Sequence, residues 1–317
     1  MRRSILIIHP GALGDVLLAV PAMRRLRAWF PQHELVLCAN EPVVQLLLEC
    51  REIDARISVQ GRACAGLFDP DGPIEGELHR RLARCDCAVA WMQDQAGSLA
   101  RNLVKAGAGE TIVSSPFSMT LKSTHQSDRF CETLQALPIR AAEFKPLQLP
   151  GEISSLSRAC LEEAGVRMDQ PFIAFHPGSG STRKSIAIAT MATMMAKLQG
   201  EGMIPVVIEG PADQEAVGNL LSRISSAVAV LRNLDLTTLA GVLSHAAKFV
   251  GHDSGVTHLA AFLGVPTLAH FGPTDPDRWA PLGSHVIVIK EPHDSVYLTT
   301  SFRATPATQG SIGNSKG

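Results

Sequence analysis

Short apolar runs alternate with longer amphipathic stretches along this chain. Apolar runs of this kind are typical of strands buried in a parallel sheet, and periodic stretches are typical of helices. The predicted strands are Ile5–Ile8, Leu35–Cys38, Cys87–Trp91, Phe172–Phe175, Ile204–Ile208, Phe249–Val250 and Thr267–Phe271. The predicted helices are Val16–Phe30, Ala96–Lys105, Asp128–Leu137, Ser155–Ala164, Ala212–Ser222, Leu236–Ala246 and Ser254–Leu263. This alternation predicts an α/β fold with parallel sheets.

The pattern divides the chain into two halves. It weakens around Pro146–Pro150, as expected of a linker, and the tripeptide His9-Pro10-Gly11 recurs as His176-Pro177-Gly178, each time after an apolar strand. A tripeptide can recur by chance, but with the same alternation in both halves it predicts two Rossmann-like domains, 1–150 and 151–298. Residues 299–317 are rich in Ser, Thr and Gly without an apolar period, which predicts a disordered tail.

Composition and charge narrow the class of protein. A chain of 317 residues suits two domains. Its net charge of −1 argues against a nucleic-acid partner. The basic clusters at 24–27 and 80–81 are more simply solvated helix faces than a surface for anionic lipids. No segment reaches the roughly 18 apolar residues of a membrane span, so any membrane association would be peripheral.

The cysteines point to a reducing compartment. Seven are present, an odd number, and no CxxC pair offers the spacing of a zinc site. We therefore expect a cytoplasmic protein with free thiols, no structural disulfide and no metal site.

The loop after the first predicted strand contains Gly11, Gly14 and Asp15. The glycines allow a ligand to approach the backbone closely, but the GxGxxG order of nicotinamide enzymes is absent. Asp15 falls at the start of a predicted helix, where an aspartate commonly stabilises the helix end. The alternative is a carboxylate that faces a cleft and takes a proton from an acceptor hydroxyl.

Two loops of the second half carry groups suited to a nucleotide. Ser179 and Lys184 lie in a Gly/Ser-rich loop that could bind phosphate, although it lacks the Walker order and Lys184 could equally be surface charge. Glu209 ends a predicted strand, where it could bond a ribose or a base, or be an exposed loop acid.

The loop from Val250 to His258 is the most informative. A helix that begins at Ser254 or Gly255 would direct free backbone amides at an anion. Asp253 suits sugar hydroxyls, and His258 shares a helix face with Ser254. The simpler interpretation is a capped helix with a packed histidine.

These motifs together resemble glycosyltransferase family 9, the heptosyltransferases of lipopolysaccharide core assembly. The resemblance rests on residues 5–18, 251–261 and 271–274 and extends from about residue 4 to about 290. It implies a GT-B fold, with two facing Rossmann-like domains and an interdomain cleft. It also implies inverting transfer of heptose from ADP-heptose to a lipid-linked saccharide, without a cofactor or bound metal, at the cytoplasmic face of the inner membrane.

The resemblance also implies roles for individual residues. Asp15 corresponds to the general base and Lys184 to the counter-cation of the diphosphate. Asp253 would hold the sugar, while Ser254, Gly255 and His258 would line the diphosphate pocket. On the acceptor side it implies Gly11, Gly14, His125 and Arg129, with no specific role for the last two.

Two departures from the family pattern keep alternatives open. Lys184 is followed by Ser185, Ile186 and Ala187, where the family has an aromatic residue and a proline. The sequence after about residue 290 also lacks the period of the family's final helix. The alternatives are a GT-B enzyme with another donor, a sugar-nucleotide epimerase, and a non-catalytic sugar-nucleotide-binding protein.

Overall fold

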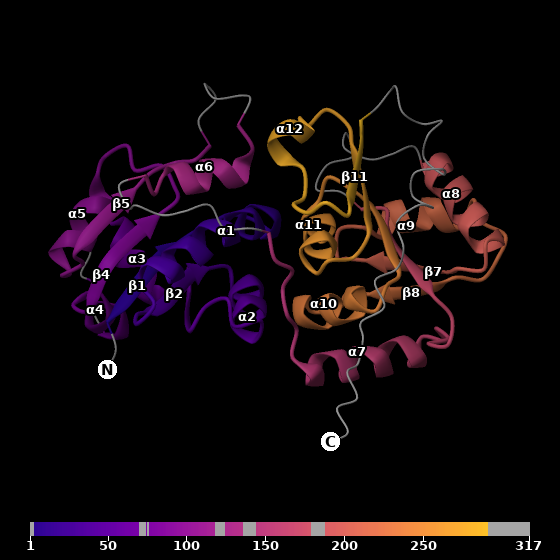
Figure 1. The fold of residues 1–317 in the computed structure, drawn as a ribbon, viewed down its shortest axis with the longest axis horizontal. Helices are drawn as coiled ribbons and strands as arrows, with labels where there is room; N and C mark the ends of the chain where they lie inside the picture. The colour runs from indigo at the N-terminus through magenta and orange to yellow at the C-terminus, as the bar shows by residue number, and fades with distance from the viewer. Residues whose placement is uncertain are drawn as a thin grey trace, which may run out of the picture.

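The computed structural model describes residues 3–69, 74, 76–117, 124–135, 144–178 and 188–290. Within these ranges the chain forms two α/β lobes, which lie side by side in Figure 1. Each lobe contains one sheet, and every strand pair is parallel. The predicted fold class is therefore confirmed. The predicted tail, 299–317, lies outside the described residues.

The N-terminal lobe has its first strand at the centre of the sheet. Its strands are β1 (Ser4–Ile8), β2 (Glu34–Ala39), β3 (Ala55–Ser58), β4 (Cys85–Ala90) and β5 (Glu110–Val113), in the order β3-β2-β1-β4-β5. Its helices are α1 (Leu13–Trp29), α2 (Glu41–Glu49), α3 (Arg62–Phe68), α4 (Gly76–Leu82), α5 (Ser98–Lys105) and α6 (Gln126–Glu132). All five residues of β1 are buried, as its apolar sequence predicts.

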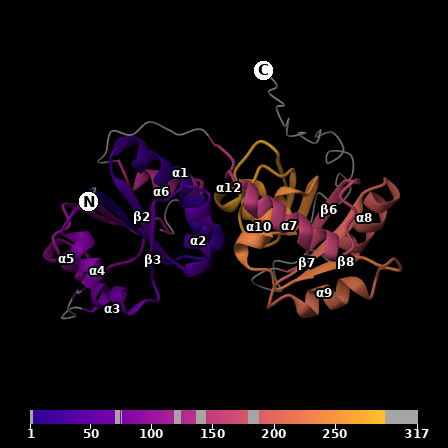
Figure 2. The same ribbon diagram turned by 90° about the horizontal axis from the view of Figure 1, so that it is seen from below.

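The C-terminal lobe repeats this scheme. Its strands are β6 (Phe172–His176), β7 (Ile204–Glu209), β8 (Ala229–Arg232), β9 (Lys248–His252), β10 (Thr267–Phe271) and β11 (Val286–Lys290), in the order β11-β10-β9-β6-β7-β8. Its helices are α7 (Gly151–Glu163), α8 (Ile188–Gly200), α9 (Gln214–Leu221), α10 (Leu236–Ser244), α11 (Gly255–Phe262) and α12 (Pro276–Trp279). α7 lies along α10 (Figure 2).

The strand order reverses beside the first strand of each lobe. The chain leaves β1 for β2 on one side and returns to β4 on the other, and β6, β7 and β9 repeat that path. Ligands of open α/β sheets bind at the carboxyl ends of the strands at such a switch point. Both copies of the His-Pro-Gly tripeptide therefore lie where a ligand site is expected.

Several predicted boundaries were wrong by a few residues. α1 begins at Leu13 rather than Val16, so Asp15 lies in its first turn. α6 spans Gln126–Glu132 rather than Asp128–Leu137. It begins two residues early because the His125 side chain caps it there by accepting the Ser127 N–H. α7 begins at Gly151, directly after the predicted linker.

The two lobes share an apolar interface. α1 packs against α11 and α2 against α10 (Figure 1). One cluster of buried apolar side chains runs through both contacts and includes Val16, Val44, Leu239 and Leu259. The interface therefore continues the cores of both lobes.

Arg24 ties the linker to this interface. Its guanidinium pairs with Glu52 at 2.5 Å, donates to the Lys145 carbonyl at 2.6 Å and lies 5.8 Å from the ring centroid of Phe262. In the same cluster, Arg27 pairs with Asp54 at 3.0 Å. Both arginines thus have partners within the chain, and Arg24 is partly buried rather than part of a solvated helix face.

All seven cysteines are free thiols, and six of them are buried. The Sγ atoms of Cys38 and Cys64 lie 3.2 Å apart. The hydrogen bond to Cys64 and burial raise the pKa of Cys38. Among the described residues, no helix has the length and apolar character needed to cross a membrane.

We predict that Arg24→Ala lowers the free energy of unfolding by about 1–3 kcal/mol, because it removes a partly buried ion pair and a linker contact together. Urea unfolding measures the change. Arg27→Ala is the matched control in the same helix, and its more exposed pair should cost less than about 1 kcal/mol. Equal losses for the two variants would contradict a special role of Arg24.

Candidate active site

A cavity of about 460 Å³ lies between the lobes. The N-terminal lobe lines it with the first turns of α1, and the C-terminal lobe lines it with the start of α11 and the segment leading into α12. The lining residues are Ala12, Gly14, Asp15, Leu18, Asp253, Ser254, Gly255, His258, Thr274 and Trp279. The structure therefore brings six predicted site residues to one cavity from loops far apart in the sequence: Gly14, Asp15, Asp253, Ser254, Gly255 and His258.

The starts of α1 and α11 lie against one another across the lobe boundary. A Cβ atom on Gly14 would lie 3.1 Å from the His258 ring, and one on Gly255 would lie 3.0 Å from Cβ of Leu13. Both separations are tighter than ordinary van der Waals contact. Glycine at these two positions thus permits the close approach of the helices.

The start of α11 is an open helix N-terminus. Ser254 is its N-cap, and its Oγ accepts the Thr257 N–H at 3.4 Å. The Thr257 hydroxyl donates to the His252 carbonyl. Side-chain capping satisfies one amide of the first turn, so other first-turn amides are available to a ligand anion.

A second cavity, of about 300 Å³, adjoins the first. It is lined by Leu13, His176, Ile208, Glu209, Gly210, Pro211, Ala212, Asp213, Leu234, Leu239, Ser254, Gly255 and Val256. Ser254 and Gly255 line both cavities, so the start of α11 separates them. Glu209 ends β7, is buried, and pairs with Arg232 at 3.2 Å. Glu209 is thus not an exposed loop acid.

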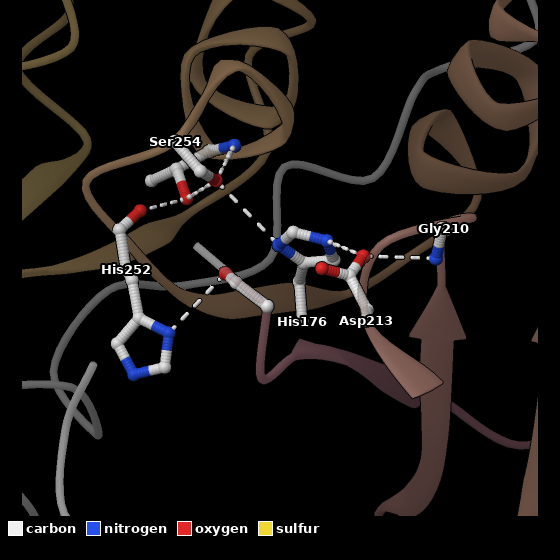
Figure 3. Close-up of polar contacts among 7 residues, drawn as sticks. His176, Gly210, Asp213, His252 and Ser254 are labelled. Atoms are coloured by element: carbon white, nitrogen blue, oxygen red, sulfur yellow. Dashed lines mark hydrogen bonds and ion pairs between the residues drawn. The ribbon is translucent and has the colours of Figure 1, made fainter. Parts of the chain in front are cut away.

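A buried polar network lies beside the start of α11 (Figure 3). His176 Nε2 lies 3.0 Å from Asp213 Oδ2, which also accepts the Gly210 N–H at 2.9 Å. His176 Nδ1 lies 3.5 Å from the Ser254 hydroxyl. The hydrogen bond from His176 is the main cause that lowers the pKa of Asp213, against the opposing effect of burial. Sequence reasoning missed Asp213, and the recurring His-Pro-Gly tripeptide was the only signal for His176.

The first copy of that tripeptide has different surroundings. His9 is fully buried and packs against Trp91 and Phe130, with ring centroids 5.9 and 5.2 Å away. Its Nδ1 accepts the Gly11 N–H at 3.1 Å. Burial lowers the pKa of His9 from its ordinary 6.5 to about 4. Burial also lowers the pKa of His252 to about 4.

The predicted acceptor-side residues of α6 do not line the first cavity. His125 Nε2 instead lies 2.9 Å from the Ala280 carbonyl of the other lobe, and Arg129 is buried and donates to the Pro116 carbonyl at 3.3 Å. They adjoin α12, whose Trp279 stacks on Phe117 at 6.3 Å between ring centroids. Trp279 is a wall residue of the cavity that sequence reasoning missed.

The remaining predictions concern Gly11, the loop with Ser179 and Lys184, and metal binding. Gly11 lies next to the cavity residues but does not line either cavity. Ser179 and Lys184 fall outside the described residues. Within the described ranges, no three His, Cys, Asp or Glu side chains cluster as they would around a metal ion.

Two facing Rossmann-like lobes with a cavity between their strand ends form the GT-B arrangement of nucleotide-sugar glycosyltransferases. Residues 121–300 match Glycosyltransferase family 9 (heptosyltransferase), which is more than half of the chain. The chain belongs to this family. The family resemblance seen in the sequence motifs is thus confirmed.

Individual relatives agree with this membership. Lipopolysaccharide heptosyltransferase 1 of Pseudomonas aeruginosa is 48% identical over 65 residues, which is 20% of this chain and 18% of that protein. The curated relatives are matched over less than half of their own lengths, from 18% to 46%.

Solved structures share the fold over nearly the whole chain. A family 9 glycosyltransferase of Veillonella parvula superimposes with a TM-score of 0.77 at 22% identity, covering 91% of this chain and 87% of that one. A heptosyltransferase of Escherichia coli solved with ADP gives 0.65 at 19% identity, covering 91% and 93%.

We predict that stability falls as the pH is lowered from about 6.5 toward 4. The unfolded state then binds protons that buried His9 and His252 do not bind, since their folded pKa values lie near 4. His9→Asn removes one such group and should flatten the slope by up to about 1.4 kcal/mol per pH unit in this window. Urea unfolding from pH 4.5 to 7.5 measures the slope.

The matched control for this prediction is His79→Asn, because His79 is exposed on α4. This variant should keep the wild-type slope. A slope that is the same in His9→Asn and wild type would show that His9 is not held neutral in the folded protein.

Proposed function

We propose that this protein is an inverting glycosyltransferase that moves heptose from ADP-heptose to a hydroxyl of a lipopolysaccharide core acceptor. One observation carries the proposal: a carboxylate of one lobe, Asp15, and an open helix N-terminus of the other lobe line the same cavity. The first suits an acceptor that loses a proton, and the second suits a leaving group that gains negative charge.

The donor fits across the two adjoining cavities. Its diphosphate would lie at the start of α11, where Ser254 and Gly255 line both cavities and amides favour an anion. The nucleoside would occupy the second, largely apolar cavity, with Glu209 toward the ribose hydroxyls. The sugar would lie in the first cavity beside Asp253. The family 9 relative solved with ADP supports a nucleoside diphosphate as the ligand.

The transfer step follows from this placement. The carboxylate of Asp15 takes the proton of the acceptor hydroxyl as the hydroxyl oxygen bonds to the anomeric carbon. The bond from that carbon to the diphosphate breaks on the opposite side, so the configuration inverts. The start of α11 stabilises the diphosphate as it departs, and Lys184 is the cation we expect to assist it.

The acceptor would enter from the N-terminal lobe, along Gly11 and Gly14, whereas His125 and Arg129 would act only as packed support on this side of the site. A lipid-linked saccharide is the acceptor class that the family implies. We therefore propose a cytoplasmic protein that contacts the inner membrane peripherally while it acts.

We predict that Asp15→Asn lowers kcat for sugar transfer by at least about a hundredfold, because the amide cannot accept the proton. The Kd for ADP should remain within about threefold, since Asp15 lies on the acceptor side of the cavity. Transfer from ADP-heptose to lipid A-Kdo and calorimetric ADP binding provide the two measurements.

The control for Asp15→Asn is Glu152→Gln, the same acid-to-amide change in the exposed first turn of α7. It should leave both values unchanged. Wild-type protein that binds ADP-heptose without transferring or hydrolysing it would instead establish a binding protein. Conversion of the donor into an isomeric sugar nucleotide, without an acceptor, would establish an epimerase.

We predict that ADP raises the melting temperature more than AMP, because the open start of α11 favours a second phosphate and a ligand of the folded state stabilises it according to its affinity. A thermal-shift series with ADP, AMP, GDP and UDP at equal concentration tests this. A larger rise in melting temperature with UDP or GDP than with ADP would show that the donor carries uracil or guanine instead of adenine. The glycosyltransferase proposal would still stand.

A further inference from the structure

One buried carboxylate connects three loops on the donor side. Asp213 belongs to the loop after β7 and accepts the Gly210 N–H of that loop at 2.9 Å. It also contacts His176, the last residue of β6, and His176 in turn contacts Ser254 after β9. Figure 3 shows these contacts as one continuous path. The path joins the ends of three neighbouring strands at the switch point of the sheet.

The chemistry of the two side chains determines which one donates the hydrogen bond between His176 and Asp213. A carboxylate can only accept hydrogen bonds, so Nε2 of His176 carries a hydrogen and donates it to Asp213. This bond fixes the orientation of the imidazole, and Nδ1 consequently faces the Ser254 hydroxyl. His176 is 4% exposed and Asp213 9% exposed, so solvent competes little for these contacts.

The backbone leaves room for the Asp213 carboxylate. A Cβ atom on Gly178 would overlap its oxygen atoms, and one on Gly210 would lie 2.8 Å from Oδ2. A second histidine also links these strand ends, because His252 Nδ1 lies 3.4 Å from the Gly178 carbonyl. Gly178 and Gly210, from two different loops, thus leave the space that the Asp213 carboxylate occupies.

We infer that Asp213 is a positioning residue for the donor diphosphate. Through His176 it holds Ser254, the N-cap of α11, and thereby sets the place of the amides that receive the phosphates. The inference rests on the proposed function. We assign no nucleophile relay to this Asp-His-Ser order, because Ser254 Oγ caps α11 and lies nearer to the Thr257 hydroxyl, at 3.1 Å, than to His176 Nδ1, at 3.5 Å.

The expected effect of Asp213→Asn falls on donor binding. Both hydrogen bonds to Asp213 end on Oδ2, so an asparagine amide oxygen in its place would accept them without the negative charge and would hold the imidazole less firmly. Loss of a charge-assisted hydrogen bond corresponds to roughly tenfold in affinity. The Kd for ADP and the KM for ADP-heptose should rise about tenfold, whereas kcat and the acceptor KM should stay within about twofold, because Asp15 is unaffected.

A second variant tests the same position without removing the carboxylate. Gly178→Ala introduces a methyl group where the Asp213 oxygens lie, so it should raise the Kd for ADP to a similar extent. The control is Val217→Ala in α9, one helical turn after Asp213 and buried in the apolar core. It should lower the melting temperature while leaving the Kd for ADP unchanged.

Calorimetric ADP binding by the four full-length proteins decides between the outcomes. Weaker binding in Asp213→Asn and Gly178→Ala, with wild-type affinity in Val217→Ala, supports the positioning role. Wild-type affinity in both loop variants overturns it and leaves the proposed function standing. Equal weakening in all three variants overturns it in favour of simple destabilisation. If wild-type protein binds neither ADP nor ADP-heptose, the proposed function and this inference both fail.

Discussion

The site depends on the close contact between two helix starts. Each helix N-terminus carries the equivalent of about half a positive charge, so two starts held together repel one another unless negative charge lies nearby. Gly14 and Gly255 allow the contact, and Asp15 and Asp253 bring carboxylates to it from the two lobes. A diphosphate would add further negative charge at the same place. The packing that joins the lobes therefore also favours an anionic ligand between them.

The two lobes use one topology for different chemistry. His9 and His176 follow the first strand of their sheets in the same tripeptide, yet His9 is enclosed by aromatic rings and His176 is paired with Asp213. Burial keeps the first neutral, whereas the second takes part in a polar path from Asp213 to Ser254, the N-cap of α11. The N-terminal copy thus supports packing, and the C-terminal copy joins a polar network beside the start of α11.

The fold was predictable because buried parallel strands are continuous apolar runs. The four edge strands β3, β5, β8 and β11 were missed, since these short strands are only partly buried. Asp15 and Ser254 were predictable as cavity residues because each follows the carboxyl end of a strand, and these ends of the two sheets face the cavity between the lobes. Asp213 and Trp279 were not, because their partners His176 and Phe117 are distant in sequence and only the tertiary fold brings them together.

The apolar seam between α1 and α11 and between α2 and α10 has a consequence for how the molecule denatures. Val16 and Leu259 belong to one hydrophobic cluster, so unfolding either lobe would expose buried apolar side chains of the other lobe to water. The two halves are consequently coupled in unfolding, although each has its own sheet. A destabilising substitution in the core of one lobe should therefore lower the stability of both lobes.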